Sequence, residues 1–312
     1  MIKHPFHFDP TYGYDRAALL AVQPPAAPDD FVPFWEQTFQ ETMALALNIE
    51  QRPLAMTHKK YNFSYIEYDT LGEWRIGAWL MVPHDGVVTR TAVMGHGYGG
   101  RGEPDTALPL ENTAVLFPCA PGFNLSARAD TPDEAMGHVV HGIESRESYI
   151  MRPCVAMIWS AASVLQTLFP AAERLFYLGN SFGGGLGALA LAWDGRFERA
   201  WLGLPTFGHH PIRLQCECVG SGEAVRRYAL AHPEVREVLA YYDAAVAATL
   251  IKTAVLVSPA VFDPAVPPPG QFAVANALRN KQLLALDAGH YEPAESFRES
   301  RRLYEALREW FV

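Results

Sequence analysis

The sequence predicts an α/β protein with a doubly wound, mostly parallel sheet and helices on both of its faces. From residue 91 onward, short apolar runs typical of buried strands alternate with longer helical stretches. Between residues 175 and 192, one such run leads into a glycine-flanked serine, and a helix of small residues follows. The 312 residues are 49% hydrophobic, which is enough for one large core. We find no repeat or linker, so we expect a single domain over residues 1–312.

The composition narrows the classes of partner. A net charge of −9 and a pI near 5.7 argue against nucleic acid or an anionic membrane surface. No apolar run is long enough to span a bilayer, and the first residues lack the apolar core of a signal peptide. Four cysteines do not make a disulfide framework, and Cys216 and Cys218 are too close to bridge easily. We therefore expect a cytoplasmic protein.

The first 60 residues form an N-terminal extension and a helix. Residues 1–30 are rich in proline and should drape over the surface without a continuous helix. Asp29 or Asp30 is placed to cap a helix over about residues 31–47. One face of that helix, at a spacing of four, is predicted to be buried, and it carries Phe31, Trp35, Phe39 and Met43.

The remaining elements follow in order. Alternating residues over 62–69 and 75–82 suit an antiparallel hairpin at a sheet edge. Further strands are expected at 92–95, 113–118, 175–179, 199–205, 252–257 and 281–286. Helices are expected at 149–168, directly after Ser181, near 234–249, and at 270–279 and 295–310. Residues 206–250 are less regular and are predicted to form a small cap or insert.

The sequence Gly-Asn-Ser-Phe-Gly at residues 179–183 is typical of a nucleophile elbow. Such a turn between strand and helix strains the serine backbone, so its neighbours must lack bulky side chains, and Gly179 and Gly183 meet that need. Gly184 and Gly185 would let the following helix approach the sheet closely. The alternative is a glycine-rich turn in which Ser181 is incidental; the flanking strand and helix favour the elbow.

Two later residues complete a candidate triad with Ser181. In α/β-hydrolases an acid and then a histidine follow the nucleophile along the chain, each after a strand. Asp263 and His290 occupy such positions, at the sheet edge where open α/β sheets place their sites. His290 would take the serine proton, and Asp263 would hold the histidine tautomer. Asp287, which also follows a strand, is the alternative acid.

The oxyanion that forms during attack on an ester requires backbone N–H donors. Phe182, the residue after the nucleophile, supplies one candidate, and Tyr98, in the loop after the strand at 92–95, supplies the other. His96 is expected to shape this loop as a structural residue.

We expect no metal or organic cofactor. The histidines and cysteines between His209 and Cys218 do not match a standard zinc spacing, and His138 and His141 lack a partner at a fitting distance along the chain. The loop Gly-Gly-Arg-Gly at 99–102 is too short for a Walker motif and lacks its Lys-Ser/Thr.

From about residue 29 onward the chain resembles the acetyl xylan esterase and cephalosporin C deacetylase family, carbohydrate esterase family seven. The resemblance rests on Asp-Phe-x-x-Phe-Trp-Glu-Gln-Thr at 30–38, Ile-x-x-Trp-Leu-x-Val-Pro at 76–83, and His-Gly-Tyr at 96–98. It continues through Gly137-His138, Gly142-Ile143, Tyr149, Arg152, the elbow at 179–186, Tyr242-Asp243 and Asp263-x-x-x-Pro-Pro. It implies an α/β-hydrolase fold, the triad of Ser181, Asp263 and His290, and oxyanion N–H groups from Tyr98 and Phe182. It also implies removal of acetyl groups from small esters, and cyclic homo-oligomers, often hexamers.

The chain departs from that family at three points. The family has Arg-Gly-Gln after the strand at 113–118, whereas this chain has Cys119-Ala120-Pro121-Gly122. The family's His-Glu is His290-Tyr291 here, and Phe182 stands where the family usually has glutamine. The triad chemistry survives these changes, but the substrate preference and the oligomer contacts are affected, because an arginine and its donors are lost.

We therefore expect a serine carboxylesterase that removes acetyl or other short acyl groups from sugars or small alcohols. One alternative is a serine peptidase or thioesterase on the same fold. Another is a catalytically silent α/β-hydrolase that binds a ligand or partner.

Overall fold

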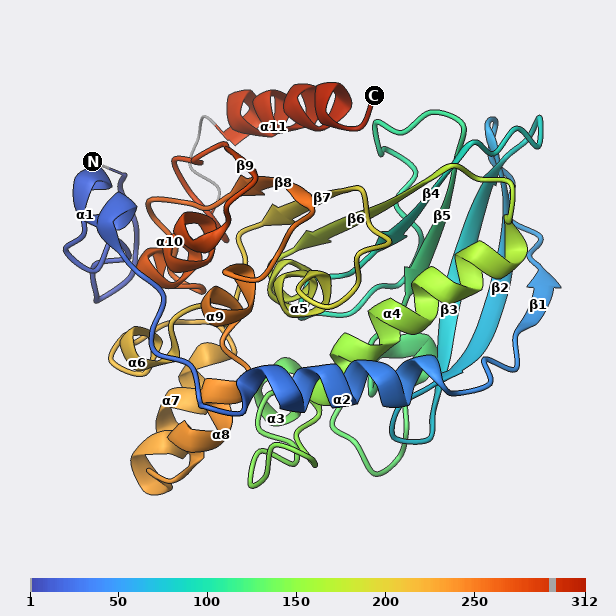
Figure 1. Cartoon of the computed structure of the whole chain (residues 1–312). Helices are drawn as coiled ribbons and strands as arrows, with labels where there is room; N and C mark the ends of the chain where they lie inside the picture. The colour runs from blue at the N-terminus through green and yellow to red at the C-terminus, as the bar shows by residue number, and fades with distance from the viewer. Residues whose placement is uncertain (1, 292–295) are drawn as a thin grey trace.

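A single nine-stranded sheet forms the centre of the computed structural model, which describes residues 2–291 and 296–312 (Figure 1). The strands lie in the order β1-β2-β3-β5-β4-β6-β7-β8-β9. Their bounds are β1 Glu50–Pro53, β2 Tyr61–Thr70, β3 Trp74–Pro83, β4 Arg90–Met94, β5 Thr113–Pro118, β6 Arg174–Asn180, β7 Arg199–Gly203, β8 Ala254–Ser258 and β9 Lys281–Leu283. From β5 to β9 all neighbours are parallel, and β1, β2 and β3 pair antiparallel at one edge. The predicted doubly wound, mostly parallel sheet and the predicted antiparallel hairpin of β2 and β3 are confirmed, but β1 lies outside this hairpin and forms the edge.

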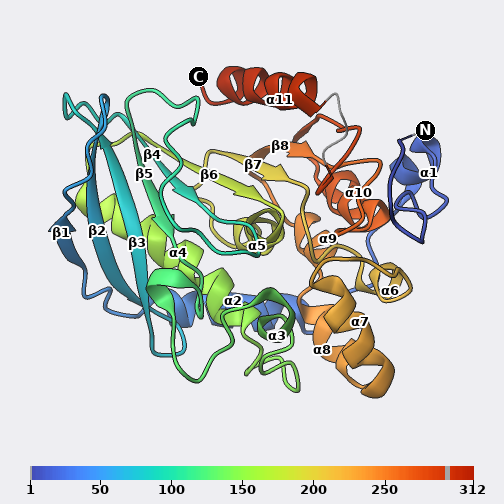
Figure 2. The ribbon, with the colours of Figure 1, turned by 180° about the vertical axis from the view of Figure 1, so that it is seen from behind.

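Helices cover both faces of this sheet, as Figure 2 shows from behind. Their bounds are α1 Arg16–Ala21, α2 Phe31–Met43, α3 Ala135–His138, α4 Met151–Leu168, α5 Phe182–Leu191, α6 His210–Arg213, α7 Gly222–Ala231, α8 Val235–Tyr241, α9 Ala244–Ala248, α10 Pro268–Ala277 and α11 Ser296–Trp310. Helices α2, α4, α5 and α9 share one core with the sheet, whereas α11 packs into the core on the other face. No helix among the described residues is long and apolar enough to cross a bilayer.

Side-chain alternation along β6 explains why two cores form. Leu175 and Tyr177 lie in the core shared with α4 and α5, and Phe176 and Leu178 lie in the core beneath α11. Successive strand residues point to opposite faces, so a strand with helices on both sides must be apolar throughout. This burial fixes the register of β6, and hence the place where Ser181 emerges.

The helix predicted at 31–47 is shorter than expected, and the prediction that Met43 lies on its buried face is wrong. Helix α2 ends at Met43, whose side chain is 42% exposed. A spacing of four residues drifts around a helix that has about 3.6 residues per turn. The buried face therefore moves from Phe31 and Trp35 to Thr38 and Thr42.

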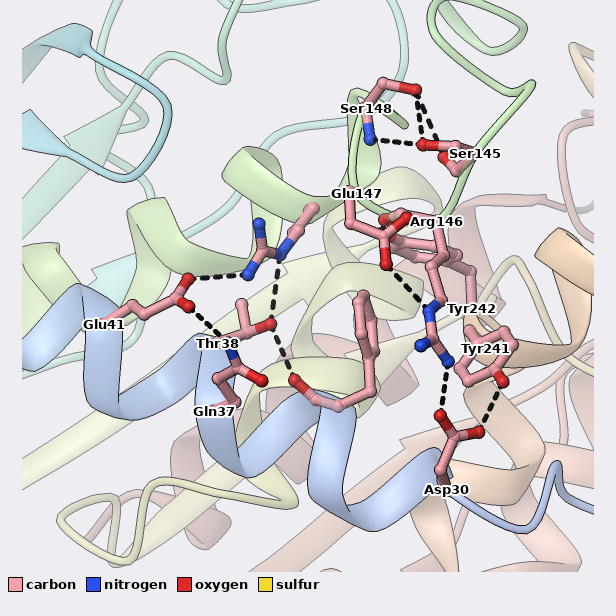
Figure 3. A network of polar contacts seen from close by, with 12 residues as sticks. Asp30, Gln37, Thr38, Glu41, Ser145, Arg146, Glu147, Ser148, Tyr241 and Tyr242 are labelled. Carbon is pink, nitrogen blue, oxygen red and sulfur yellow. Dashed lines mark hydrogen bonds and ion pairs between the residues drawn. The ribbon is translucent and has the colours of Figure 1, made fainter.

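Polar contacts tie α2 to neighbouring segments of the chain (Figure 3). Arg146 donates to Asp30 at 2.6 Å, and the Tyr241 hydroxyl donates to the same carboxylate. Farther along α2, Arg152 of α4 pairs with Glu41 at 2.7 Å. These bonds connect the N-terminal helix to the loop before α4 and to α8.

The insert at 206–250 holds four short helices in place of the one helix predicted near 234–249. Asp243 separates α8 from α9, because its carboxylate accepts from the N–H groups of Ala245 at 2.9 Å and Val246 at 3.4 Å. The same carboxylate accepts from His209 at 3.0 Å and His210 at 2.7 Å, and so fixes the start of α6. An aspartate that caps one helix thus anchors another.

Several boundaries also differ from the prediction. The exposed edge strand β1 and the short helix α1 were not expected; the four residues of β1 lack the apolar alternation that would reveal a strand. Strand β9 ends at Leu283, although Leu286 still pairs with Ala260 in an isolated bridge. The predicted start of the last helix, Glu295, lies outside the described residues.

Candidate active site

Ser181 lies at the sharp turn between β6 and α5. Its backbone has φ 56° and ψ −113°, a region that residues with a side chain seldom adopt. A Cβ atom at Gly179 would lie 2.4 Å from the Gly183 carbonyl oxygen, and one at Gly184 would lie 2.5 Å from that of Gly203. Glycine is therefore required at both positions, as predicted, and the turn presents the serine above the carboxyl ends of the strands.

His290 connects Ser181 to an acid. Its Nε2 lies 2.8 Å from Ser181 Oγ, and its Nδ1 lies 2.8 Å from Asp263 Oδ2. Since an ionised carboxylate only accepts, Nδ1–H donates to Asp263 and Nε2 is left to accept from the serine hydroxyl. This tautomer is the one that a general base for Ser181 requires.

Asp263 is fully buried and completely hydrogen-bonded. Its Oδ1 accepts from the N–H groups of Ala265 and Val266, both at 2.9 Å, while Oδ2 accepts from Gln271 at 2.8 Å as well as from His290. Burial of a carboxylate is tolerable when its lone pairs are satisfied in this way.

Asp287, the alternative acid, is exposed, and its backbone N–H donates to Glu299. No hydrogen bond between Asp287 and His290 occurs within residues 2–291 and 296–312. The histidine therefore pairs with Asp263.

The pKa of His290 is raised above its ordinary value. Burial by itself lowers this pKa, but the hydrogen bond to Asp263 and the negative charge of Asp263 together raise it. A quarter of the His290 side chain remains accessible, whereas Asp263 has none. The ring can thus exchange protons with a bound molecule, and its buried partner stays fixed.

Tyr98 and Phe182 lie together beside Ser181. Their rings stack with centroids 4.1 Å apart. Among the described residues, neither the Tyr98 N–H nor the Phe182 N–H donates to a backbone carbonyl in a turn, loop or cap. His96 is held by two bonds: its Nδ1 donates to the Gly97 carbonyl at 2.7 Å, and its Nε2 accepts from Ala120 N–H at 2.9 Å. Burial lowers the pKa of His96 to about 4, which suits a neutral, structural role.

Arg101 lies near Cys119, and Cys119 lies in the loop where the family that this chain resembles has Arg-Gly-Gln. The Arg101 guanidinium lies over the Phe117 ring at 4.8 Å and donates to the Gly95 carbonyl at 3.0 Å. Burial lowers its pKa to about 10 and raises that of the nearby Cys119 thiol to about 11. The loop after β4 therefore supplies a buried positive charge beside Cys119.

A cavity of about 510 Å³ opens over Ser181 and His290. Its size is typical of small-molecule sites. Its lining comes from the Tyr98 loop, the segment before α3, the insert and the Asp263 loop, and includes Tyr98, Asp133, Glu134, Thr206, Arg213 and Val266. A second cavity of about 340 Å³, lined in part by His210 and Arg236, does not contain the serine.

The candidate metal ligands are engaged otherwise. His138 accepts from the Tyr98 hydroxyl at 3.0 Å and donates to the Pro121 carbonyl at 2.8 Å, which occupies both ring nitrogens. His210 lies 3.2 Å from the Tyr242 carbonyl, and all four cysteines are free and buried. No cluster of three or more metal-binding side chains occurs within the described residues.

Two supports of the site were missed by the sequence analysis. Gln271 is buried, donates to both Asp263 and the Val266 carbonyl, and accepts from Ala260 N–H at 2.9 Å. The N-terminal segment also reaches the site: the Pro10 carbonyl accepts from Asp263 N–H at 3.2 Å. A glutamine after a proline run carries no recognised signal, and no local pattern predicts so distant a contact.

Comparison with known proteins gives a consistent result. The sequence model of the acetyl xylan esterase family matches residues 23–306. Acetyl xylan esterase 1 from Thermoanaerobacterium sp. superposes with a TM-score of 0.82, at 18% identity, over 98% of this chain and 100% of that one. An acetyl xylan esterase from Paenibacillus sp. gives 0.80, at 22% identity, over 94% and 99%. An acylaminoacyl peptidase from Pyrococcus horikoshii gives 0.62, at 15% identity, over 81% of this chain and 42% of that one.

Proposed function

The chain belongs to the acetyl xylan esterase family, and we propose that it removes acetyl or other short acyl groups from sugars or small alcohols through an acyl-Ser181 intermediate. It is a serine carboxylic-ester hydrolase. The observation that supports the proposal best is the continuous chain of hydrogen bonds from Ser181 Oγ through His290 to Asp263. We assign Ser181 as the nucleophile and His290 as the general base. We assign Asp263 as the residue that orients His290 and stabilises its positive charge once it is protonated.

Acylation begins when Ser181 Oγ attacks the ester carbonyl carbon and His290 Nε2 takes the hydroxyl proton. The carbonyl π electrons move to the oxygen, and the N–H groups of Tyr98 and Phe182 stabilise the resulting negative charge. His290, now an imidazolium, is stabilised by Asp263. When the tetrahedral intermediate collapses, the carbon–oxygen bond to the alcohol breaks and His290 gives its proton to the departing alkoxide.

Deacylation repeats these steps with water. His290 Nε2 takes a proton from a water molecule as its oxygen attacks the acyl-serine carbonyl. The second tetrahedral intermediate breaks the bond to Ser181 Oγ, which regains a proton from His290. The acid is released and the enzyme is restored. None of these steps requires a metal or an organic cofactor.

We expect kcat/KM for an acetyl ester to fall about tenfold per pH unit below a midpoint that lies above pH 6.5. The reason is that protonated His290 cannot accept the serine proton, and Asp263 raises its pKa. His96 and His138, whose pKa values are lowered by burial to about 4, stay neutral over this range. Initial rates from pH 4.5 to 9 test this, with thermal unfolding at each pH as the control for folding. A midpoint below pH 6.5 would contradict the assignment.

We expect short acyl chains to be preferred, because Tyr98 lines the cavity beside Ser181 and its ring is stacked on the buried Phe182 ring. In a panel of p-nitrophenyl esters, acetate should be hydrolysed with a kcat/KM about tenfold or more above that of octanoate, since overpacking a fixed wall costs more than about 1 kcal/mol. Acetylated sugars extend the panel to the alcohol half. Faster hydrolysis of octanoate than of acetate would refute the small acyl pocket.

Two other functions are separated by the same assay. The peptidase from Pyrococcus horikoshii shares the fold, but this chain spans less than half of its length. Peptide amides and acyl thioesters should be cleaved far more slowly than acetyl esters if the esterase proposal holds. A silent binding protein would hydrolyse none of them.

We further infer one domain over residues 1–312, with residues 206–250 as a cap that forms part of the cavity wall. The four free, buried cysteines support a reducing, cytoplasmic location. The family resemblance supports a cyclic homo-oligomer. Light scattering on the purified protein measures the assembly, and a monomer would argue against this last inference.

A further inference from the structure

Arg213 is an arginine for which the proposed reaction has no use, yet it lines the cavity above Ser181. It is the last residue of α6, and it shares the cavity wall with Ser181, His290 and Thr206. The residue is only 6% exposed. A guanidinium is always charged and carries five N–H donors, so its burial calls for partners.

No hydrogen bond or ion pair of the Arg213 side chain occurs within the described residues. Its Nε is buried and has no partner. The Phe207 ring lies 5.7 Å from the guanidinium carbon. By contrast, Arg152 and Arg196 each pair with a carboxylate, at 2.7 and 2.6 Å. Arg213 is thus a buried cation at the cavity that, among the described residues, forms no ion pair with a carboxylate.

The surroundings hold this side chain in place. A Cβ atom at Gly222 would lie 2.7 Å from Arg213 Nη2, and one at Gly270 would lie 3.2 Å from its Cγ. Glycine at both positions leaves room for the arginine. The backbone of α6 is itself fixed, because Asp243 accepts from His209 and His210. A donor group on such a fixed turn is organised before any ligand binds.

Two carboxylates line the same cavity without neutralising Arg213. Asp133 and Glu134 are both exposed, and Glu134 accepts from the N–H groups of Met136 at 2.8 Å and Gly137 at 2.6 Å at the start of α3. Charges on exposed side chains are screened by water and salt, whereas a buried charge is screened much less. The cavity therefore has an acidic outer wall and a cationic inner wall.

We propose that Arg213 binds a carboxylate on the alcohol half of the ester, so that the enzyme prefers acidic acetylated alcohols such as acetylated uronic acids. This inference rests on the proposed function. A planar carboxylate can accept two parallel N–H bonds from a guanidinium, which suits donors that have no protein acceptor. The carboxylate must lie in the alcohol half, because an acetyl group has no second polar group.

The test compares two monoacetates that differ only in the group at carbon six of the sugar. They are methyl glucuronoside and methyl glucoside, acetylated at the same hydroxyl. The wild-type enzyme should hydrolyse the acidic ester with a kcat/KM about 10- to 100-fold higher, the range expected for charge-assisted hydrogen bonds. In Arg213→Gln this ratio should fall to about 1, mainly through KM, because the lost contact is made equally in the ground and transition states. Arg213→Lys should give an intermediate ratio.

The matched control is Arg301→Gln, which removes the same charge from an exposed pair on α11 and should leave the ratio unchanged. Equal losses on both esters in Arg213→Gln, or no acid preference in the wild type, would overturn the inference and leave the esterase proposal standing. If neither sugar ester is hydrolysed and p-nitrophenyl acetate is not hydrolysed either, the esterase proposal fails. Binding of methyl glucuronoside to Ser181→Ala then decides the matter: it should be lost in the double variant with Arg213→Gln, and equal binding with and without Arg213 would overturn the inference.

Discussion

Replacing Ser181 with alanine should lower kcat for an acetyl ester by about 10⁴- to 10⁶-fold. The substitution removes the hydroxyl oxygen that we assign as the nucleophile and leaves the Cβ atom in place. The backbone bonds of the elbow do not involve this oxygen: Ser181 N–H donates to the Gly203 carbonyl at 2.8 Å, and the Ser181 carbonyl accepts from Gly185 at 3.0 Å. The turn, with its positive φ, should therefore keep its shape.

The measurement combines initial rates with a fluorophosphonate probe, which reacts covalently with an activated serine. The probe should label the wild-type enzyme and leave Ser181→Ala unlabelled. Ser64→Ala is the matched control, because Ser64 lies on β2 and, in the part of the chain that is described, its hydroxyl bonds only the Gln51 side chain. It should keep both its rate and its labelling. Undiminished labelling of Ser181→Ala would assign the nucleophile to another residue.

Much of this site could be predicted from local sequence. Glycine is required where backbone approaches backbone, so the glycine pattern identifies the elbow at residues 179–183 in the sequence. Asp263 and His290 could be placed because parallel strands end at one edge of the sheet, so residues after β8 and β9 must lie near Ser181. Each inference needed only a strand assignment and a residue type.

Other parts depended on contacts between distant segments. Gln271, the Pro10 carbonyl and Arg213 reach the site from α10, the N-terminal segment and α6, and nothing near them in the sequence specifies that approach. Within the insert at 206–250, helices α8 and α9 are separated at Asp243, whose carboxylate caps α9 and also accepts from the distant His209 and His210. Propensity over a short window does not contain such information.

The buried face of α2 contains Thr38 and Thr42, whereas Met43 was predicted there. This difference has another origin. Threonine is polar, so a pattern of apolar residues passes over it. In the structure, each threonine hydroxyl donates at 2.8 Å to the carbonyl four residues earlier, Thr38 to Phe34 and Thr42 to Thr38. This local bond removes the cost of burying the hydroxyl. The helix could be predicted, whereas its buried face depends on the hydrogen bonds of these two threonine hydroxyls.

Asp263→Asn should lower kcat by about 10⁴-fold while the protein remains folded. Oδ1 of Asp263 accepts from Ala265 and Val266, so the carbonyl oxygen of an asparagine must take that position. Its NH₂ group then faces His290 Nδ1 and donates to it. The histidine proton is thereby moved to Nε2. A protonated Nε2 can no longer accept a hydrogen bond or a proton from Ser181. The asparagine NH₂ also meets the Gln271 NH₂ group, so one polar bond is lost as well.

The pH profile separates this effect from a merely structural one. In the wild type, Asp263 raises the pKa of His290 against the opposing effect of burial. Without the carboxylate only burial remains, so the acid limb of the residual activity should move below about pH 6.5. Asp287→Asn is the matched control, because Asp287 is exposed and lies three positions before His290 in the sequence; it should keep both rate and profile. A large loss in Asp287→Asn with little loss in Asp263→Asn would reverse the assignment of the acid, since only the residue that holds Nδ1–H can set the tautomer that Ser181 needs.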